Sequence, residues 1–98
     1  DLLKQLNTEM DRYAYSSITR MELLGFSSIS SLEEESITRL LSAINGLPIT
    51  GAIEDETIRL RKVCRIKLPD AFILATARVH SLKLLTLDKE LAKIAESV

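Results

Sequence analysis

Short strand-like segments alternate with longer helical segments along this chain of 98 residues. RYAYS at 12–16 alternates polar and apolar residues, LPIT at 47–50 lies between turn-forming residues, and KLLT at 83–86 has the composition of an interior strand. Helical periodicity fills the intervals between them. This alternation predicts an α/β layer fold with a short, mainly parallel sheet flanked by helices.

Each predicted helix starts beside a residue that is typical of a helix N-terminus: Ser17, Ser31, Thr50, Pro69 and Asp88. Ser31 and Glu34 have the spacing of a capping box, and a further helix is expected to end near Met10. The helix from Pro69 to His80 is apolar almost all round, so we expect it to be buried.

Composition excludes several classes of protein. The length fits one domain, and 46% hydrophobic residues are too many for an intrinsically disordered chain. No apolar run is long enough to cross a bilayer or to serve as a signal peptide, so no membrane partner and a cytoplasmic location are expected. The single cysteine excludes an internal disulfide framework and a Cys-based zinc site, and the single histidine excludes most His-rich metal sites. The net charge of -1 argues against nucleic-acid binding through bulk positive charge.

Three acidic residues stand where ligands collect in parallel sheets. Glu22 lies one turn into the helix after the first strand, Asp70 lies in the first turn of the apolar helix, and Asp88 follows the last strand. Carboxylates that meet at one edge of a sheet form an oxygen-rich site suited to Mg²⁺ or Mn²⁺. The alternative is structural, because Asp70 and Asp88 also stand where an acid favours the helix dipole.

The sequence segments that contain these acids favour the metal site over a purely structural role. SSITRMEL, LPDAFILATARVHSL and LLTLDKEL occur in this order, and together the three segments resemble the PIN-domain ribonucleases, most closely the VapC-like toxins of bacterial and archaeal toxin–antitoxin pairs. The resemblance implies a PIN-like three-layer fold over residues 1–98. It also implies that Glu22, Asp70 and Asp88 are three of the family's four metal-binding acids. Ser17, Thr19 and Thr86 lie beside these acids and could donate hydrogen bonds to them or act as solvated caps.

The resemblance also implies an activity and partners. A metal-dependent endoribonuclease uses Mg²⁺ or Mn²⁺ to activate water and to relieve charge on the scissile phosphate. The implied substrate is RNA, and the implied partners are a cognate antitoxin protein and a second copy of the chain. The helix from Ser31 to Asn45 is the candidate dimer surface.

One part of the family pattern has no counterpart here. The family's first strand ends in an Asp-Thr-Asn type motif that supplies the first acid, whereas Asp1 is followed by a helical segment. We therefore expect the domain to be N-terminally incomplete. The alternative function is a non-catalytic PIN-like remnant that serves as an interaction or dimerisation module.

The remaining basic, histidine, cysteine and tyrosine residues could serve a function, but each also has a structural interpretation. Residues 59–67 include five bases that could grip phosphates, but Asp55 and Arg59 have ion-pair spacing on one helix. His80 is expected to be a C-terminal cap and Cys64 a buried small hydrophobe. Tyr13 and Tyr15 are expected to pack against neighbours and not to stack on bases.

Overall fold

The computed structural model describes residues 13–98, and the helix end expected near Met10 lies outside them. The chain divides into two compact units that meet in sequence between Pro48 and Ile49. The expected single domain stays a prediction. Among the described helices, none has both the length and the hydrophobicity that a bilayer crossing requires.

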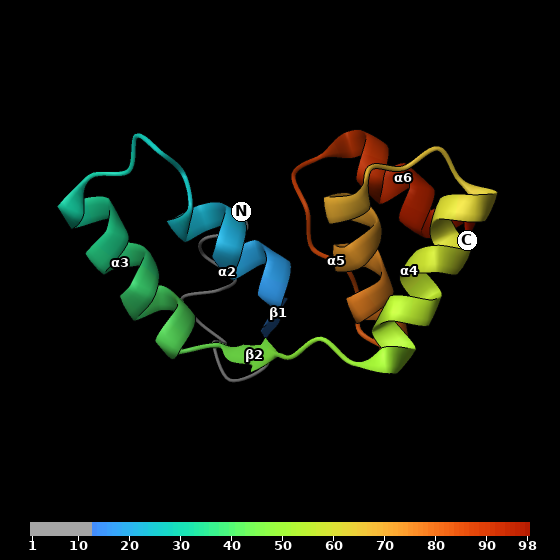
Figure 1. The fold of residues 1–98 in the computed structure, drawn as a ribbon, viewed down its shortest axis with the longest axis horizontal. Coiled ribbons are helices and arrows are strands. Elements are labelled where there is room, and N and C mark those ends of the chain that lie inside the picture. Colours follow the sequence, from blue (N-terminus) through green and yellow to red (C-terminus); the bar gives the residue numbers. More distant parts are fainter. Residues whose placement is uncertain (1–12) are drawn as a thin grey trace. The chain divides into compact units, whose positions relative to one another are not determined.

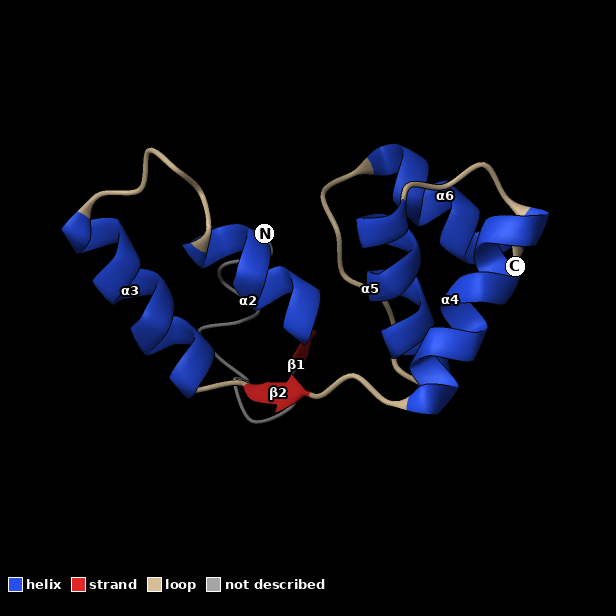
Figure 2. Ribbon diagram, viewed as in Figure 1, coloured by secondary structure: helices blue, strands red, loops and turns tan. Residues whose placement is uncertain are grey.

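The first unit contains a two-stranded parallel sheet and two helices. In chain order these are β1 (Ala14–Ser16), α2 (Ser17–Leu24), α3 (Ser31–Ser42) and β2 (Asn45–Leu47) (Figure 1). The strands, red in Figure 2, pair in parallel with Tyr15 opposite Gly46. Parallel pairing requires a crossover connection, and α2 and α3 supply it. This confirms the predicted mixed α/β architecture with a short parallel sheet.

Gly46 lies close to the side chain of Tyr15 on its partner strand. A Cβ atom at Gly46 would lie 2.9 Å from the hydroxyl oxygen of Tyr15. The Tyr15 ring therefore occupies the space in which a side chain at position 46 would stand. Tyr13 and Tyr15 are both half-buried, in agreement with packing roles.

The helix caps of this unit differ by one residue from the prediction. Ser16, not Ser17, caps α2, since its Oγ accepts a hydrogen bond from the Ile18 N–H at 3.1 Å. The capping box of α3 is formed by Ser30 and Glu33, in place of Ser31 and Glu34. Consecutive serines offer the same chemistry at adjacent positions, so composition alone does not select one of them.

The second unit is built from three helices: α4 (Gly51–Val63), α5 (Leu68–Val79) and α6 (Lys89–Ser97). Thr50 caps α4 as predicted, since its hydroxyl oxygen accepts from the Ile53 N–H. A cluster of buried aliphatic side chains from all three helices forms the core: Ile53, Leu60, Leu74, Ala75 and Leu91.

The predicted strand at 83–86 is wrong. This segment has no strand geometry in the described structure, and the only strand pair among residues 13–98 lies in the first unit. A strand exists only where a neighbour accepts and donates its backbone hydrogen bonds, and the second unit supplies none to this segment. Leu84 instead packs half-buried against the helical core. The predicted strand at 47–50 is wrong except at Leu47, because β2 begins at Asn45 and ends at Leu47.

The apolar helix α5 is buried along most of its length. Ala71, Leu74 and Ala75 are almost completely covered, and Phe72 is half-buried. The expectation is wrong at Val79, which is exposed where the helix ends. Burial of α5 is therefore confirmed for its N-terminal and central turns.

An ion-pair network joins α4 to α5. Glu56 accepts from the Arg59 Nε at 2.7 Å and from the Arg78 Nε at 2.6 Å. Arg78 also donates to the Val98 carbonyl oxygen at 3.0 Å. The hydrogen bond from Arg59, helped by Arg78 and opposed by partial desolvation, lowers the pKa of Glu56 from 4.5 to about 2.

Truncation of Leu74 should create a core cavity, because its side chain is only 2% exposed. We expect Leu74→Ala to lower the free energy of unfolding by roughly 2–5 kcal/mol. Chemical denaturation measures this loss. Val79→Ala, a truncation at an exposed position of the same helix, is the control and should cost far less. A loss below about 0.5 kcal/mol for Leu74→Ala would contradict the helical core.

The Glu56 network should make stability depend on acid. The folded pKa is lower than the unfolded one, so the network stabilises the protein fully above pH 4.5 and loses this contribution as the pH falls towards 2. Because both arginines are partly exposed, Glu56→Gln should cost only about 1 kcal/mol at pH 7. The difference in Tm between wild type and Glu56→Gln should shrink between pH 4.5 and 2. A constant difference across that range would show that the charge on Glu56 contributes nothing.

Candidate functional site

Glu22 is carried by a helix that is tied to the sheet. It lies exposed on α2, whose first residue, Ser17, donates from its hydroxyl to the Leu47 carbonyl oxygen of β2 at 3.2 Å. Thr19 lies half-buried on the same helix. This bond fixes the start of α2 against β2, and Glu22 follows one turn later.

Asp70 occupies the first turn of α5 and is half-buried. The N-cap residue of this helix is Lys67, and no side chain caps the helix through a hydrogen bond. Asp70 therefore does not cap α5, although its charge suits the positive end of the helix. Its carboxylate makes no hydrogen bond or ion pair with another residue in the part of the chain that the structure describes.

Asp88 has the structural role that the alternative interpretation predicts. It is the N-cap of α6, and its Oδ1 accepts from the Glu90 N–H at 2.9 Å and from the Leu91 N–H at 3.1 Å. Just before it, the Thr86 hydroxyl oxygen accepts from the Asp88 N–H at 3.1 Å. The turn that presents Asp88 is thus fixed from both sides.

The three acids are divided between the two units. Glu22 belongs to the first unit, and Asp70 and Asp88 belong to the second. Among residues 13–98, no three His, Cys, Asp or Glu side chains are gathered into a metal-binding group. A site shared by the three acids therefore stays a prediction of the sequence.

The basic segment after the middle of α4 is mostly exposed. Arg59 pairs with Glu56 and not with Asp55, so the partner predicted from spacing is wrong. An (i, i+3) partner is also within reach on a helix, and here Glu56 is already held by Arg78. The hydrogen bonds to Glu56 raise the pKa of Arg59. The other bases of the segment are exposed: Arg61, Lys62, Arg65 and Lys67.

The remaining candidate groups have structural positions. His80 is the C-cap residue of α5, as predicted, and its backbone N–H bonds to the Thr76 carbonyl oxygen. Cys64 is the C-cap residue of α4 and is half-buried, which is less than the full burial expected. These two positions do not point to catalysis.

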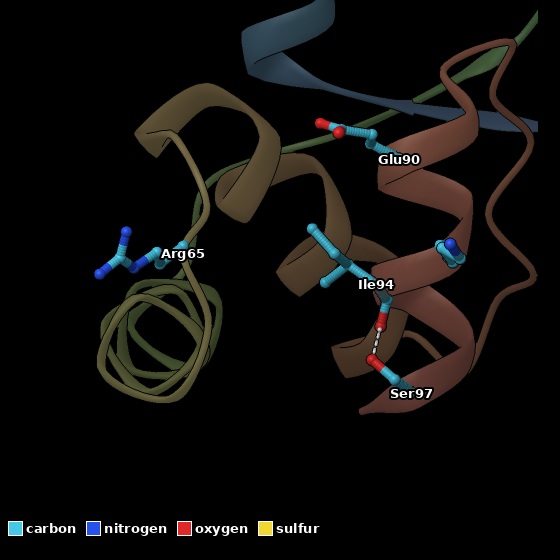
Figure 3. A pocket seen from close by; sticks show the side chains of 5 residues that line it. Arg65, Glu90, Ile94 and Ser97 are labelled. Carbon is cyan, nitrogen blue, oxygen red and sulfur yellow. Dashed lines mark hydrogen bonds between the residues drawn. The ribbon is translucent and has the colours of Figure 1, made fainter.

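The second unit also has an open pocket that sequence reasoning did not identify. It has a volume of about 460 Å³ and is lined by residues of the α4–α5 connection and of α6: Arg65, Glu90, Lys93, Ile94 and Ser97. In Figure 3, the Arg65 guanidinium points away from α6, and the Ser97 hydroxyl is bonded to the Ile94 carbonyl oxygen. The pocket mixes both charge signs and contains none of the three predicted acids, so no sequence motif marks it.

Comparisons with known proteins agree with the motifs. The family model for the PIN domain matches residues 1–97, a range that includes all three acids. Among solved structures, a chain described as "Toxin-antitoxin complex from Klebsiella pneumoniae" is similar, with 33% sequence identity and a TM-score of 0.76. The match covers 89% of this chain and 72% of that chain. No curated protein matches the sequence.

Proposed function

The chain belongs to the PIN-domain family, and on that premise we propose that it is a metal-dependent endoribonuclease, the toxin of a toxin–antitoxin pair. PIN domains are generally nucleases that use divalent metals. The observation that carries the proposal is the family match over residues 1–97. The similar solved chain, described as part of a toxin–antitoxin complex, supports an antitoxin partner.

The residues that would hold the metal are Glu22, Asp70 and Asp88. The donor set fits Mg²⁺ or Mn²⁺, because carboxylate oxygens are the hard ligands that these ions prefer. Asp70 supports this assignment, since its half-buried carboxylate has no bonding partner among the described residues. A bound ion would supply charge relief for the phosphate and a more acidic water.

The surrounding residues fix the backbone that carries the two carboxylates of the second unit, Asp70 and Asp88. α5 carries Asp70 directly before Ala71, which is completely buried, so the core fixes the backbone that presents this carboxylate. Thr86 and the start of α6 hold the backbone of Asp88 in one conformation. Preorganised ligands of this kind suit phosphodiester hydrolysis, in which the protein mainly positions charge.

The proposed partners are RNA, an antitoxin and a second copy of the chain. The net charge of -1 means that RNA would be held locally, through the metal and through bases such as Arg61 and Lys62. For the homodimer, α3 remains the candidate surface, because Leu32 is 77% exposed near its start. An apolar side chain of this size gains stability when a partner covers it.

Divalent ions should stabilise the protein through the three acids. We expect millimolar Mn²⁺ to raise the Tm of the wild type, because an ion that binds only the folded state stabilises that state. The gain should disappear in Asp70→Asn. Asp55→Asn makes the same chemical change at an exposed position on α4 and should keep the gain. A gain that survives Asp70→Asn would place the ion elsewhere.

RNA cleavage tests the activity directly. The protein is incubated with total RNA in Mg²⁺ or Mn²⁺, with and without EDTA, and the products are resolved on a gel. Cleavage should require the ion and should fall at least about 100-fold in Asp70→Asn, while Asp55→Asn should cut like the wild type. If the folded wild type binds the ion but cuts no RNA, the nuclease proposal fails and a non-catalytic interaction module takes its place.

A further inference from the structure

The open pocket of the second unit lies outside the proposed metal site, because none of the three predicted acids lines it. Its volume of about 460 Å³ is within the range of small-molecule sites, roughly 300–1,000 Å³. Two basic side chains and one acidic side chain, Arg65, Lys93 and Glu90, line it together with the apolar Ile94. A ligand that fits this lining has a charged part and a flat or apolar part.

Both walls of the pocket are attached to the core. Ile94 of α6 is half-buried and packs against the aliphatic core cluster, and so does Ile66, the residue that follows Arg65. In Figure 3, the side chains of Glu90 and Ile94 extend from α6 towards the side on which Arg65 lies. The pocket is therefore formed before a ligand arrives, which reduces the entropy that binding would cost.

The charged groups around the pocket are unpaired within the described part of the chain. Glu90 and Lys93 carry opposite charges and stand three residues apart on α6, a spacing that allows pairing, yet they form no salt bridge with each other or with Arg65. Glu56, elsewhere in the unit, binds two arginines. A ligand can therefore reach both signs of charge at the pocket without breaking an existing pair.

Basic residues dominate the surroundings of the pocket. The unit from Ile49 to Val98 contains nine basic and seven acidic residues, although the whole chain has a net charge of -1. Arg61, Lys62 and Lys67 are exposed and lie before and after Arg65 in the chain. Local positive charge of this kind favours a ligand that carries phosphate groups.

We propose that this pocket binds one nucleotide of the RNA substrate. Arg65 and Lys93 hold the phosphate, and the base lies on Ile94 with its edge towards Glu90. Single-stranded RNA is recognised in this way, because an unstacked base exposes a face for packing and an edge for hydrogen bonds. The inference rests on the proposed function and deepens it, since it assigns a specificity-determining residue for the RNA.

The pocket shares its two segments with two of the proposed metal ligands. Asp88 caps α6, the helix that carries Glu90 and Lys93. The connection that contains Arg65 leads into the first turn of α5, where Asp70 lies. In Figure 1, α5 and α6 both begin at the end of the unit where this connection crosses. A nucleotide in the pocket would thus belong to the strand that the metal site cuts.

Glu90 determines which base the pocket prefers. A carboxylate has two acceptor oxygens and no donor, so its best partner offers two donors side by side. Guanine is the base that does so, through its N1–H and its N2 amino group. Adenine, cytosine and uracil each place an acceptor next to their donor, and that acceptor would face a carboxylate oxygen. The pocket should therefore favour guanine.

Binding can be measured without any metal or activity. The protein is titrated in EDTA with each of the four ribonucleoside 5′-monophosphates, and the amide shifts of the pocket residues are followed by NMR. 5′-GMP should bind about 10-fold more tightly than 5′-UMP, which is the size of effect expected from one bidentate contact to a base. Added salt should weaken the binding of all four nucleotides, because each one binds partly through its phosphate.

Substitutions separate the base contact from the phosphate contacts. Glu90→Gln should abolish the preference for guanine and leave 5′-UMP binding unchanged, whereas Glu96→Gln, the same change at an exposed position of α6 outside the pocket, should keep the preference. Lys93→Ala should weaken all four nucleotides by a similar factor, about 3-fold, while Lys83→Ala should weaken none of them. The substituted side chains are exposed, and amide shifts away from the pocket report that each variant is folded.

RNA cleavage provides a second readout. The fragments that the wild type produces should have a guanine at a fixed position relative to their ends. Glu90→Gln should lose this bias while it still cuts RNA, because the proposed metal ligands are unchanged. Glu96→Gln should retain the bias.

The outcomes distinguish this inference from the proposed function. If the nucleotides shift no pocket amides while RNA is still cut, this inference alone fails. If all four nucleotides bind equally, the assignment of Glu90 is wrong. If hexaglutamate shifts the pocket amides and the nucleotides do not, the pocket binds a protein and the proposal is overturned. If 5′-GMP binds as expected but no RNA is cut, the nucleotide site stands and only the nuclease activity is removed.

Discussion

The contact of α5 with α4 is the interaction on which the rest of the second unit depends. Leu74 and Ala75 of α5 meet Ile53 and Leu60 of α4 in a cluster that excludes water almost completely, and Leu91 adds α6 to it. Burial of aliphatic surface is the main favourable term in a domain this small. The same contact places Asp70, because the next residue, Ala71, is fully buried against the core. A proposed ligand is thus attached to the most firmly packed helix of the unit.

Two acidic residues of this unit, Glu56 and Asp70, differ in whether their carboxylates are already paired with basic side chains. Glu56 is satisfied by two arginines and has its pKa lowered to about 2, so it stays ionised under all ordinary conditions. A carboxylate that is already engaged in this way is a poor ligand, because an arriving ion must displace its partners. Asp70, by contrast, has no such partner in the described chain, so a cation that bound there would displace none. This difference favours Asp70 over Glu56 as the proposed ligand.

The sequence predicted a helix cap or an ion-pair partner correctly where only one suitable residue was present. It predicted them wrongly where two adjacent residues offered the same chemistry. Thr50 and Asp88 are isolated capping residues, and both cap the helices predicted for them. The serine pairs at 16–17 and 30–31 offered two equivalent caps each, and in both cases the first serine is used. The choice of Glu56 over Asp55 as the partner of Arg59 depends on Arg78, which comes from another helix. Local patterns contain no information about a group that arrives from 22 residues away.

For the candidate site, too, the sequence predicts what is local along the chain and does not predict what depends on the fold. The motifs around Glu22, Asp70 and Asp88 identify a family and the acids to examine, because they are local and ordered along the chain. They do not show that Asp88 uses Oδ1 for α6, since this depends on the direction from which two backbone N–H groups approach. At a helix N-terminus, a carboxylate is commonly explained either by capping or by function. Because each of its oxygens can bind independently, evidence for the first explanation does not count against the second.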